Sequence, residues 1–245
     1  VVQAVASEEP GRVIGTLVNY ASHPEVLGDS QGILSPDFCG PFYDKLEAEA
    51  GGVALYMNSA QGGMVTADVR GPDGEDMRTW AECVRIGELL ASEALRIVGD
   101  APLQTAPGLY CVAKEVDFPI DTELLQAILE QSPFDYLGAA TDHITTTLNL
   151  VNLGTAQMLT IPGEALPNIG YYLKRKMPTR HPFLLGLTND AFGYILTKVD
   201  YNSFKRYNYI SRTSLGEMTG EIYIEEALEL VGNSPKPDNP PADTR

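Results

Sequence analysis

The chain has few of the residues that bind soft metals or form disulfides. Among its 245 residues are only three histidines and three cysteines. The cysteines, Cys39, Cys83 and Cys111, have no CxxC spacing, and because three is an odd number at least one of them is unpaired within the chain. The cysteines therefore do not indicate whether the protein works in a reducing or an oxidising compartment.

Basic residues are also scarce. The chain has 17 Lys and Arg against 33 Asp and Glu, which gives a formal net charge of −16. Binding to nucleic acid requires a basic face that neutralises phosphates, so this charge argues against a nucleic-acid partner. No apolar run reaches the roughly eighteen residues that a membrane helix needs, so we expect no transmembrane segment.

The start of the chain, "VVQAVAS", has no initiator Met and no signal-like segment. We therefore expect a fragment or one piece of a processed protein, and the sequence leaves the compartment undetermined. The hydrophobic content of 44% is enough for a substantial core, in one large domain or two small ones.

Apolar runs that are typical of strands alternate along most of the chain with segments whose apolar residues recur at helical spacing. The predicted strands are 13–19, 53–57, 107–120, 145–154, 156–161 and 182–187. The predicted helices are 42–50 with a start near Asp37, 77–98, 121–131 capped by Asp121, the later part of 163–177, and 215–231. This alternation predicts an α/β fold with strands packed between helices. The end, 233–245, is rich in Pro, Asp and Asn and is predicted to be a disordered tail after a domain over 1–232.

Four segments leave a predicted strand and at once carry polar or Gly-rich residues, namely "NYASHPE", "NSAQGGMVTAD", "IPGEALP" and "LTNDAFGYILT". Chemistry in α/β proteins is carried by loops at strand ends. A His, a Glu and a Tyr presented from separate strand ends could meet at one metal ion, and imidazole and carboxylate suit zinc. The alternative is that His23 is a hydrogen-bonded turn residue.

The same segments, in the same order, resemble elements of the neutral/alkaline (non-lysosomal) ceramidases, and more closely the shorter bacterial proteins that are similar to their N-terminal domain. The matching stretches are "LVNYASHPEVLG" with "LSPDFCG", then "ALYMNSAQGGMVTAD", "LTIPGEAL" and "GLTNDAFGYILTKVDYNSFKRYNY", closed by "TSLG". They span nearly the whole chain up to the tail. The resemblance implies mixed sheets flanked by helices around a zinc ion. It also implies hydrolysis of the amide bond of N-acyl sphingosine, or a related N-acyl amide, through a metal-activated water.

Residue by residue, the resemblance implies that His23, Glu164 and Tyr194 are zinc ligands. With a one-residue shift, Tyr207 matches a tyrosine that helps polarise the substrate carbonyl, although Asn208 replaces the glutamate that follows it in the family. Thr66, again with a one-residue shift, matches a nucleophile-like serine. Metal-bound water is the expected nucleophile and Thr66 the alternative. Tyr207 or the backbone N–H groups of the Gly62-Gly63 turn would stabilise the oxyanion.

Other hydroxyl and imidazole groups are interpreted as structural. Tyr201 matches a further tyrosine of the family, and Ser59 is expected to be a turn or cap residue. His143 starts a predicted strand, and His181 is expected in a surface loop.

The family has another zinc-binding His in a segment that precedes this region, so the chain offers at most three protein ligands. We therefore expect a site with an open side, completed by an N-terminal segment or a further subunit. If the chain is like the family, it is secreted or periplasmic. The alternatives are a catalytically incomplete fragment and a metal-independent structural or binding module. The substrate would be a small or lipid amide whose acyl chain and amine the sequence leaves undefined.

Overall fold

The structure of the protein is a computed structural model that describes residues 1–9, 11–30, 32–63, 65–133, 142–203, 205 and 208–238. The chain divides into two compact units. Unit 1 contains 1–58 and 64–103, and unit 2 contains 59–63 and 104–245. The loop between the third strand and the second helix contributes residues to both units, and the single domain over 1–232 stays a prediction.

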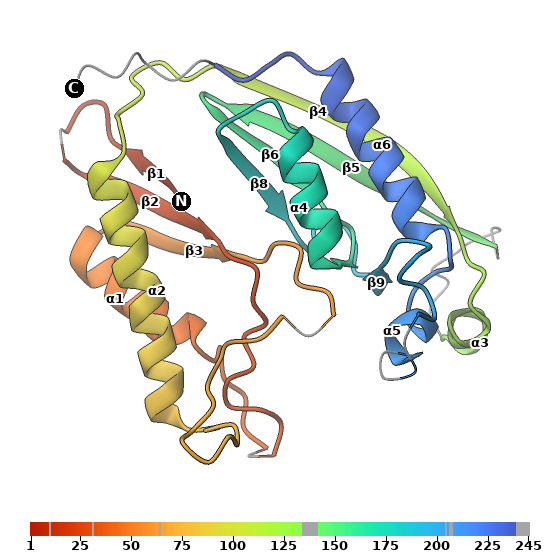
Figure 1. Cartoon of the computed structure of the whole chain (residues 1–245). Coiled ribbons are helices and arrows are strands. Elements are labelled where there is room, and N and C mark those ends of the chain that lie inside the picture. The colour runs from red at the N-terminus through yellow and green to blue at the C-terminus, as the bar shows by residue number, and fades with distance from the viewer. Residues whose placement is uncertain are drawn as a thin grey trace. The chain divides into compact units, whose positions relative to one another are not determined.

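Unit 1 combines a mixed sheet with two helices, which lie side by side (Figure 1). Its elements are β1 (Val2–Val5), β2 (Val13–Asn19), α1 (Cys39–Ala50), β3 (Val53–Met57) and α2 (Trp80–Asp100). The strand order is β1-β2-β3, with β1 antiparallel and β3 parallel to β2. The parallel pair is joined through α1, which is the usual crossover between parallel strands.

Helix α2 packs on α1 through a narrow stripe of small buried residues, namely Cys83, Gly87, Ala91 and Ala94. A Cβ atom at Gly87 would lie only 2.5 Å from the Phe38 carbonyl oxygen, so glycine permits the close approach of the two helices. The helix begins at Trp80 rather than at the predicted residue 77, because the Thr79 hydroxyl accepts the Glu82 N–H and caps the first turn.

Unit 2 contains a four-stranded sheet of order β4-β5-β6-β8 and a small two-stranded sheet of β7 and β9. The strands are β4 (Leu109–Pro119), β5 (His143–Leu153), β6 (Ala156–Thr160), β7 (Glu164–Ala165), β8 (His181–Leu185) and β9 (Tyr194–Ile195). The helices are α3 (Glu123–Gln131), α4 (Pro167–Lys176), α5 (Asn208–Arg212) and α6 (Thr219–Asn233). Strands β4, β5 and β6 are antiparallel neighbours, and β8 runs parallel to β6.

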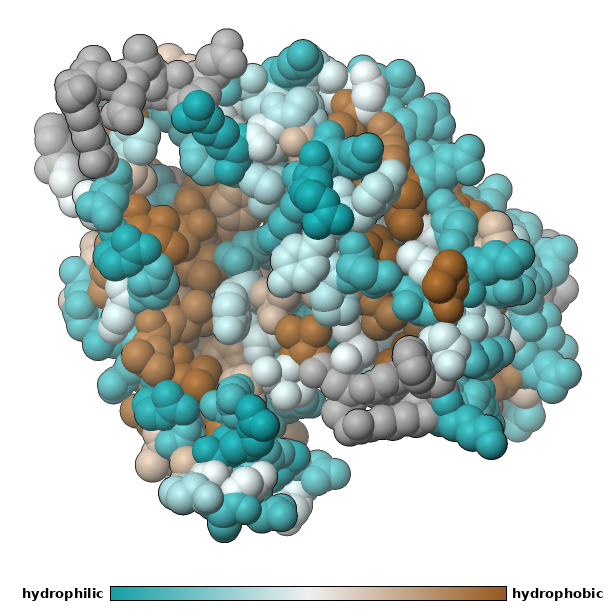
Figure 2. All heavy atoms as spheres, viewed as in Figure 1, coloured by the Kyte–Doolittle hydropathy of each residue, from teal (hydrophilic) through white to brown (hydrophobic). Residues whose placement is uncertain are grey.

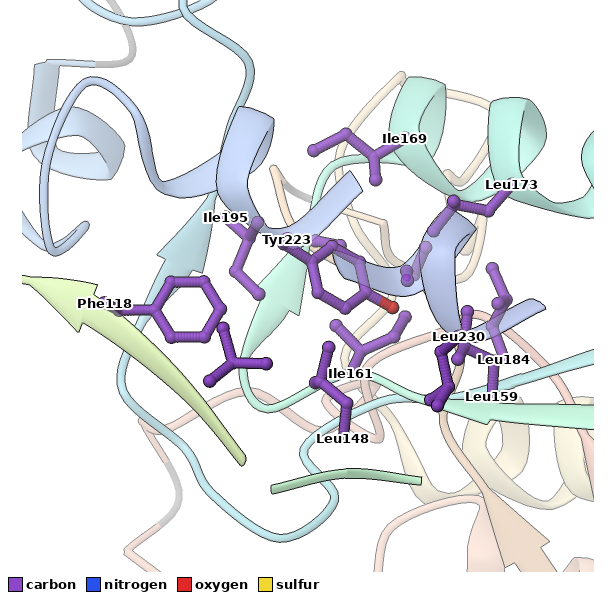
Figure 3. Packing of buried hydrophobic residues seen from close by; sticks show 14 of the residues in the cluster. Phe118, Leu148, Leu159, Ile161, Ile169, Leu173, Leu184, Ile195, Tyr223 and Leu230 are labelled. Carbon is purple, nitrogen blue, oxygen red and sulfur yellow. The ribbon is translucent and has the colours of Figure 1, made fainter. Parts of the chain in front are cut away.

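Helices α4 and α6 cover one face of the four-stranded sheet, and the main core of unit 2 lies beneath them (Figure 1). Figure 3 shows the ring of Tyr223 among labelled aliphatic side chains from the sheet and from α4. Its hydroxyl donates to the Thr160 carbonyl at 3.0 Å, and complete burial raises the pKa of this phenol. Ala60, from the Gly-rich loop, belongs to the same cluster.

The predicted tail is partly built into unit 2. Helix α6 ends at Asn233, and beyond it the Asp238 N–H donates to the Gly154 carbonyl at 2.9 Å. The Asp238 carboxylate in turn accepts the Gly108 N–H at 2.8 Å. Asp238 therefore ties the segment 234–238 to residues that flank β4 and β5, while 239–245 lie outside the described residues.

The predicted α/β class is confirmed, and differences from the expected elements are local. Helix α3 begins at Glu123 with Thr122 at its N-cap, so the predicted cap at Asp121 is wrong. The Thr122 hydroxyl is used elsewhere, since it donates to the Ser214 carbonyl. The sequence predicted neither β1 nor α5.

Hydrophilic side chains cover much of the visible surface, interrupted by hydrophobic patches (Figure 2). Within the described residues, no helix combines the length and apolarity that crossing a membrane requires.

Two glycines of α2 should respond to alanine with opposite signs. Gly87→Ala should destabilise the protein by about 1–3 kcal/mol, because the new methyl group overpacks the contact with α1. Gly99→Ala should stabilise it by up to about 1 kcal/mol, because no atom lies within 4 Å of the new Cβ and alanine is the better helix former. Urea unfolding measures both changes, and a neutral or stabilising Gly87→Ala would contradict the described packing.

The three thiols should differ in reactivity. Cys39 and Cys83 are buried, and burial together with the nearby Asp37 carboxylate raises the pKa of Cys39 to about 12 and that of Cys83 to about 11. A raised pKa keeps the thiol protonated and unreactive at pH 8, whereas Cys111 is exposed. Iodoacetamide at pH 8 should therefore label Cys111 rapidly and the other two only after unfolding. Peptide mass spectrometry identifies the sites, with Cys111→Ser as the control that removes the fast phase.

Candidate functional site

Glu164 and Tyr194 are paired directly across the small parallel sheet of β7 and β9. Neighbouring strands are about 4.8 Å apart, and residues paired in a ladder project to the same face. The other pair, Ala165 and Ile195, points the opposite way and is fully buried in the core of unit 2. The register therefore places a carboxylate and a phenol together on the half-buried face. Two of the three predicted ligands thus come from adjacent backbone positions.

Glycines allow the backbones around this pair to approach closely. The Glu164 N–H donates to the Gly193 carbonyl at 2.9 Å, and a Cβ atom on Gly163 would clash with that same carbonyl oxygen. Gly193 itself has φ of +103°, and a Cβ atom there would collide with the Thr213 carbonyl oxygen. The glycines of "PGE" and "FGY" are thus needed for the ladder that carries Glu164 and Tyr194.

The Gly62-Gly63 turn also packs on β7. The Gly62 N–H donates to the Ala165 carbonyl at 2.9 Å, and a Cβ atom on Gly62 would clash with the Glu164 carbonyl oxygen. The expected oxyanion role is therefore wrong for the Gly62 N–H, because the Ala165 carbonyl already accepts it, and stays a prediction for the Gly63 N–H. Gly63 has φ of +74°, which favours glycine in a turn of this shape.

His23 belongs to unit 1, in the loop that follows β2. Its side chain is half-buried, and its N–H donates to the Val65 carbonyl at 3.0 Å. The Tyr56 hydroxyl donates to the Ser22 carbonyl at 2.7 Å, and burial raises the pKa of Tyr56, so this donor stays protonated. Thr66, next to Val65, is exposed.

Asp37 organises the loop that contains His23. It is 5% exposed and has φ of 54°, which is unusual for a residue other than glycine. One carboxylate oxygen accepts the N–H groups of Val26 and Phe38 at 3.1 and 2.7 Å, and the other accepts that of Leu27 at 2.8 Å. A single buried carboxylate thus joins the "HPEVLG" loop to the start of α1. Sequence reasoning took Asp37 only as a helix start, although its position in the matched "SPDFCG" stretch was a signal of a larger role.

The remaining candidates have separate environments. Tyr207 lies outside the described residues. Ser59 is buried in unit 2, and Tyr201 is half-buried in the loop after β9. His143 begins β5 as predicted, and its hydrogen bond to Asp142 lowers the pKa of that carboxyl. His181 was expected in a surface loop, but it is the first residue of β8, and its Nδ1 lies 3.0 Å from the Thr155 hydroxyl.

The donor chemistry around β7 fits a zinc ion in part. Carboxylate oxygen and imidazole nitrogen are ligands of catalytic zinc, and Glu164 and Tyr194 present oxygen donors on one face. The described part of the chain holds no group of three or more His, Cys, Asp or Glu side chains arranged to bind a metal. The expected set contains only two residues of those types, with Tyr194 as the third donor.

Comparison with solved structures identifies the fold. The chain matches the crystal structure of neutral ceramidase from Pseudomonas aeruginosa with a TM-score of 0.70 and 16% identity, over 97% of this chain and 47% of that one. It matches a ceramidase complexed with C2 with a TM-score of 0.72 and 16% identity, over 97% and 48% of the two chains. The chain therefore has a ceramidase-like fold and spans about half the length of these proteins. No family model matches the sequence, and no curated protein does.

Replacing Asp37 should destabilise unit 1. Asp37→Ala leaves three buried N–H groups without their acceptor, and we expect a loss of about 3 kcal/mol or more in the free energy of unfolding. Asp37→Asn should lose less, since an amide keeps one acceptor oxygen. The matched control is Asp44→Ala, an exposed aspartate of α1. Equal urea midpoints for Asp37→Ala and Asp44→Ala would contradict the described role.

Proposed function

We propose that this chain forms part of a zinc-dependent amide hydrolase that acts on N-acyl sphingosine or a related N-acyl amide. The observation that carries the proposal is the direct pairing of Glu164 with Tyr194 in a ceramidase-like fold. Further support comes from the four matched segments, which occur in the family's order and contain these two residues. A neutral lipid amide also suits a chain of net charge −16 better than an anionic substrate does.

In this proposal Glu164, Tyr194 and His23 hold the metal. When bound, zinc supplies a Lewis acid that polarises the amide carbonyl and activates water. The Gly62-Gly63 turn, held on β7, supports the Glu164 backbone from its other side.

Two further roles belong to the proposal. Tyr207 donates a hydrogen bond to the reacting carbonyl, in the manner of an oxyanion-stabilising group. The Thr66 hydroxyl positions substrate, and a direct attack by this hydroxyl is the alternative route. A fourth metal ligand would come from a histidine in an N-terminal segment or a subunit that completes the site.

A non-catalytic role is the second candidate. It is favoured by the identity of only 16% to the ceramidases, because a fold can be shared at this distance without the reaction. The two candidates differ in one observable, because a structural or binding module needs no zinc for its function.

The experiment measures zinc content and hydrolysis of N-acyl sphingosine by the full-length protein. Removal of zinc by a chelator should abolish hydrolysis, and added zinc should restore it. Glu164→Ala should lose both metal and activity, because it removes a ligand carboxylate. Thr66→Ala should keep its zinc and much of its activity, because only a positioning hydroxyl is lost. Tyr171→Phe, an exposed tyrosine of α4, is the control.

Two results would change the assignment. A Thr66→Ala variant that keeps its zinc but is slower by about a thousandfold or more, as after removal of a nucleophile, would favour the covalent route. A wild-type protein that contains no zinc and hydrolyses no amide, even with the completing segment present, would favour the non-catalytic candidate.

A further inference from the structure

Tyr194 has an aromatic neighbour that sequence reasoning did not identify. The ring of Tyr209 meets the ring of Tyr194 nearly at a right angle, with an interplanar angle of 85° and 5.8 Å between the centroids. This is the edge-to-face arrangement that aromatic pairs prefer. Tyr209 comes from α5, a short helix that follows β9 in the chain.

Hydrogen bonds through Thr213 also connect the backbones of Tyr209 and Tyr194. The Thr213 N–H and hydroxyl both donate to the Tyr209 carbonyl, at 3.0 and 2.7 Å. The Thr213 carbonyl then accepts the Tyr194 N–H at 3.1 Å. The backbone of Tyr194 is therefore tied to the same turn that supplies the ring packed on its side chain.

The turn that carries Tyr209 is anchored on both sides. Ile210 and Ser211 are each 3% exposed, and the Ser211 hydroxyl accepts the Asn202 N–H at 2.8 Å. Tyr209 itself is 42% exposed, so it contributes little to the core. Among the described residues, the aromatic contact of the Tyr209 ring is with Tyr194.

We propose that Tyr209 is a positioning residue that holds the Tyr194 ring so that its phenol oxygen faces the same side as the Glu164 carboxylate. The inference rests on the proposed function for its metal-binding part. Residues that orient a metal ligand reduce the freedom the ligand must lose on binding, and their removal typically weakens metal affinity. A tyrosine side chain has two torsions to fix, and the edge-to-face contact with Tyr209 disfavours ring orientations of Tyr194 that would break it.

The test compares Tyr209→Leu and Tyr209→Phe. The control is Tyr171→Leu, which replaces a tyrosine of α4 that is 66% exposed. The first measurement is the NMR spectrum of ring-labelled tyrosine, with the Tyr194 signals assigned by Tyr194→Phe. The second is the zinc dissociation constant by chelator competition. Urea unfolding of each variant shows whether the fold is retained.

Tyr209→Leu should shift the Tyr194 ring signals and weaken zinc binding by about tenfold, the lower end for loss of an orienting residue. Tyr209→Phe keeps the ring and should restore both properties, and Tyr171→Leu should change neither. Unshifted Tyr194 signals in Tyr209→Leu would overturn the positioning role. Shifted signals with unchanged zinc affinity would overturn its link to the metal. A wild-type protein that binds no zinc would overturn the proposed function and this link, and the NMR comparison would still decide the ring contact.

Discussion

The register of the short β7–β9 ladder is the constraint on which the candidate site depends. Side chains alternate between the two faces of a strand, so the register that buries Ala165 and Ile195 also presents Glu164 beside Tyr194. A slip of one residue would exchange the two faces and put the carboxylate into the apolar core. Burial of the apolar pair therefore fixes the polar pair. Packing of Ala165 and Ile195 in the core of unit 2 thus helps to specify which face carries Glu164 and Tyr194.

A ladder of two residues per strand has too few hydrogen bonds to hold this register alone, and the surrounding backbone supplies the rest. Gly62 bonds to one edge of β7, and Thr213 bonds to the far side of β9. Both approaches need a residue without a side chain, at Gly62 and at Gly193. In unit 1 a side chain, rather than close backbone approach at glycines, fixes a loop. There the buried carboxylate of Asp37 collects three backbone N–H groups and so fixes the loop that begins at His23.

The sequence predicted the fold class and most long elements, because periodic burial leaves a strong pattern in strands such as β5 and helices such as α2. Through their resemblance to a known family, "PGE" and "GYILT" were also predicted to supply the metal ligands Glu164 and Tyr194. It could not predict that Glu164 and Tyr194 are register partners, because β7 and β9 are too short for any periodicity. Asp37 and Tyr209 were missed for a related reason. Their roles depend on backbone groups and a ring that are distant in sequence, and no local pattern reports such contacts.

The residues that build the scaffold and those that would carry the chemistry are largely different. Gly62, Gly163, Gly193 and Asp37 act through backbone approach and backbone hydrogen bonds, so their replacement disturbs the fold itself. Glu164 and Tyr194 are half-buried at the edge of the core, and the ladder that presents them is made by main-chain atoms. Side-chain changes at these two positions should leave the register intact. A ceramidase-like fold at 16% identity is consistent with this division, because close backbone contacts constrain a few small residues and leave most side chains free to vary. The fold alone does not specify a reaction, and the proposed metal binding by Glu164 and Tyr194 is the property that would connect this scaffold to hydrolysis.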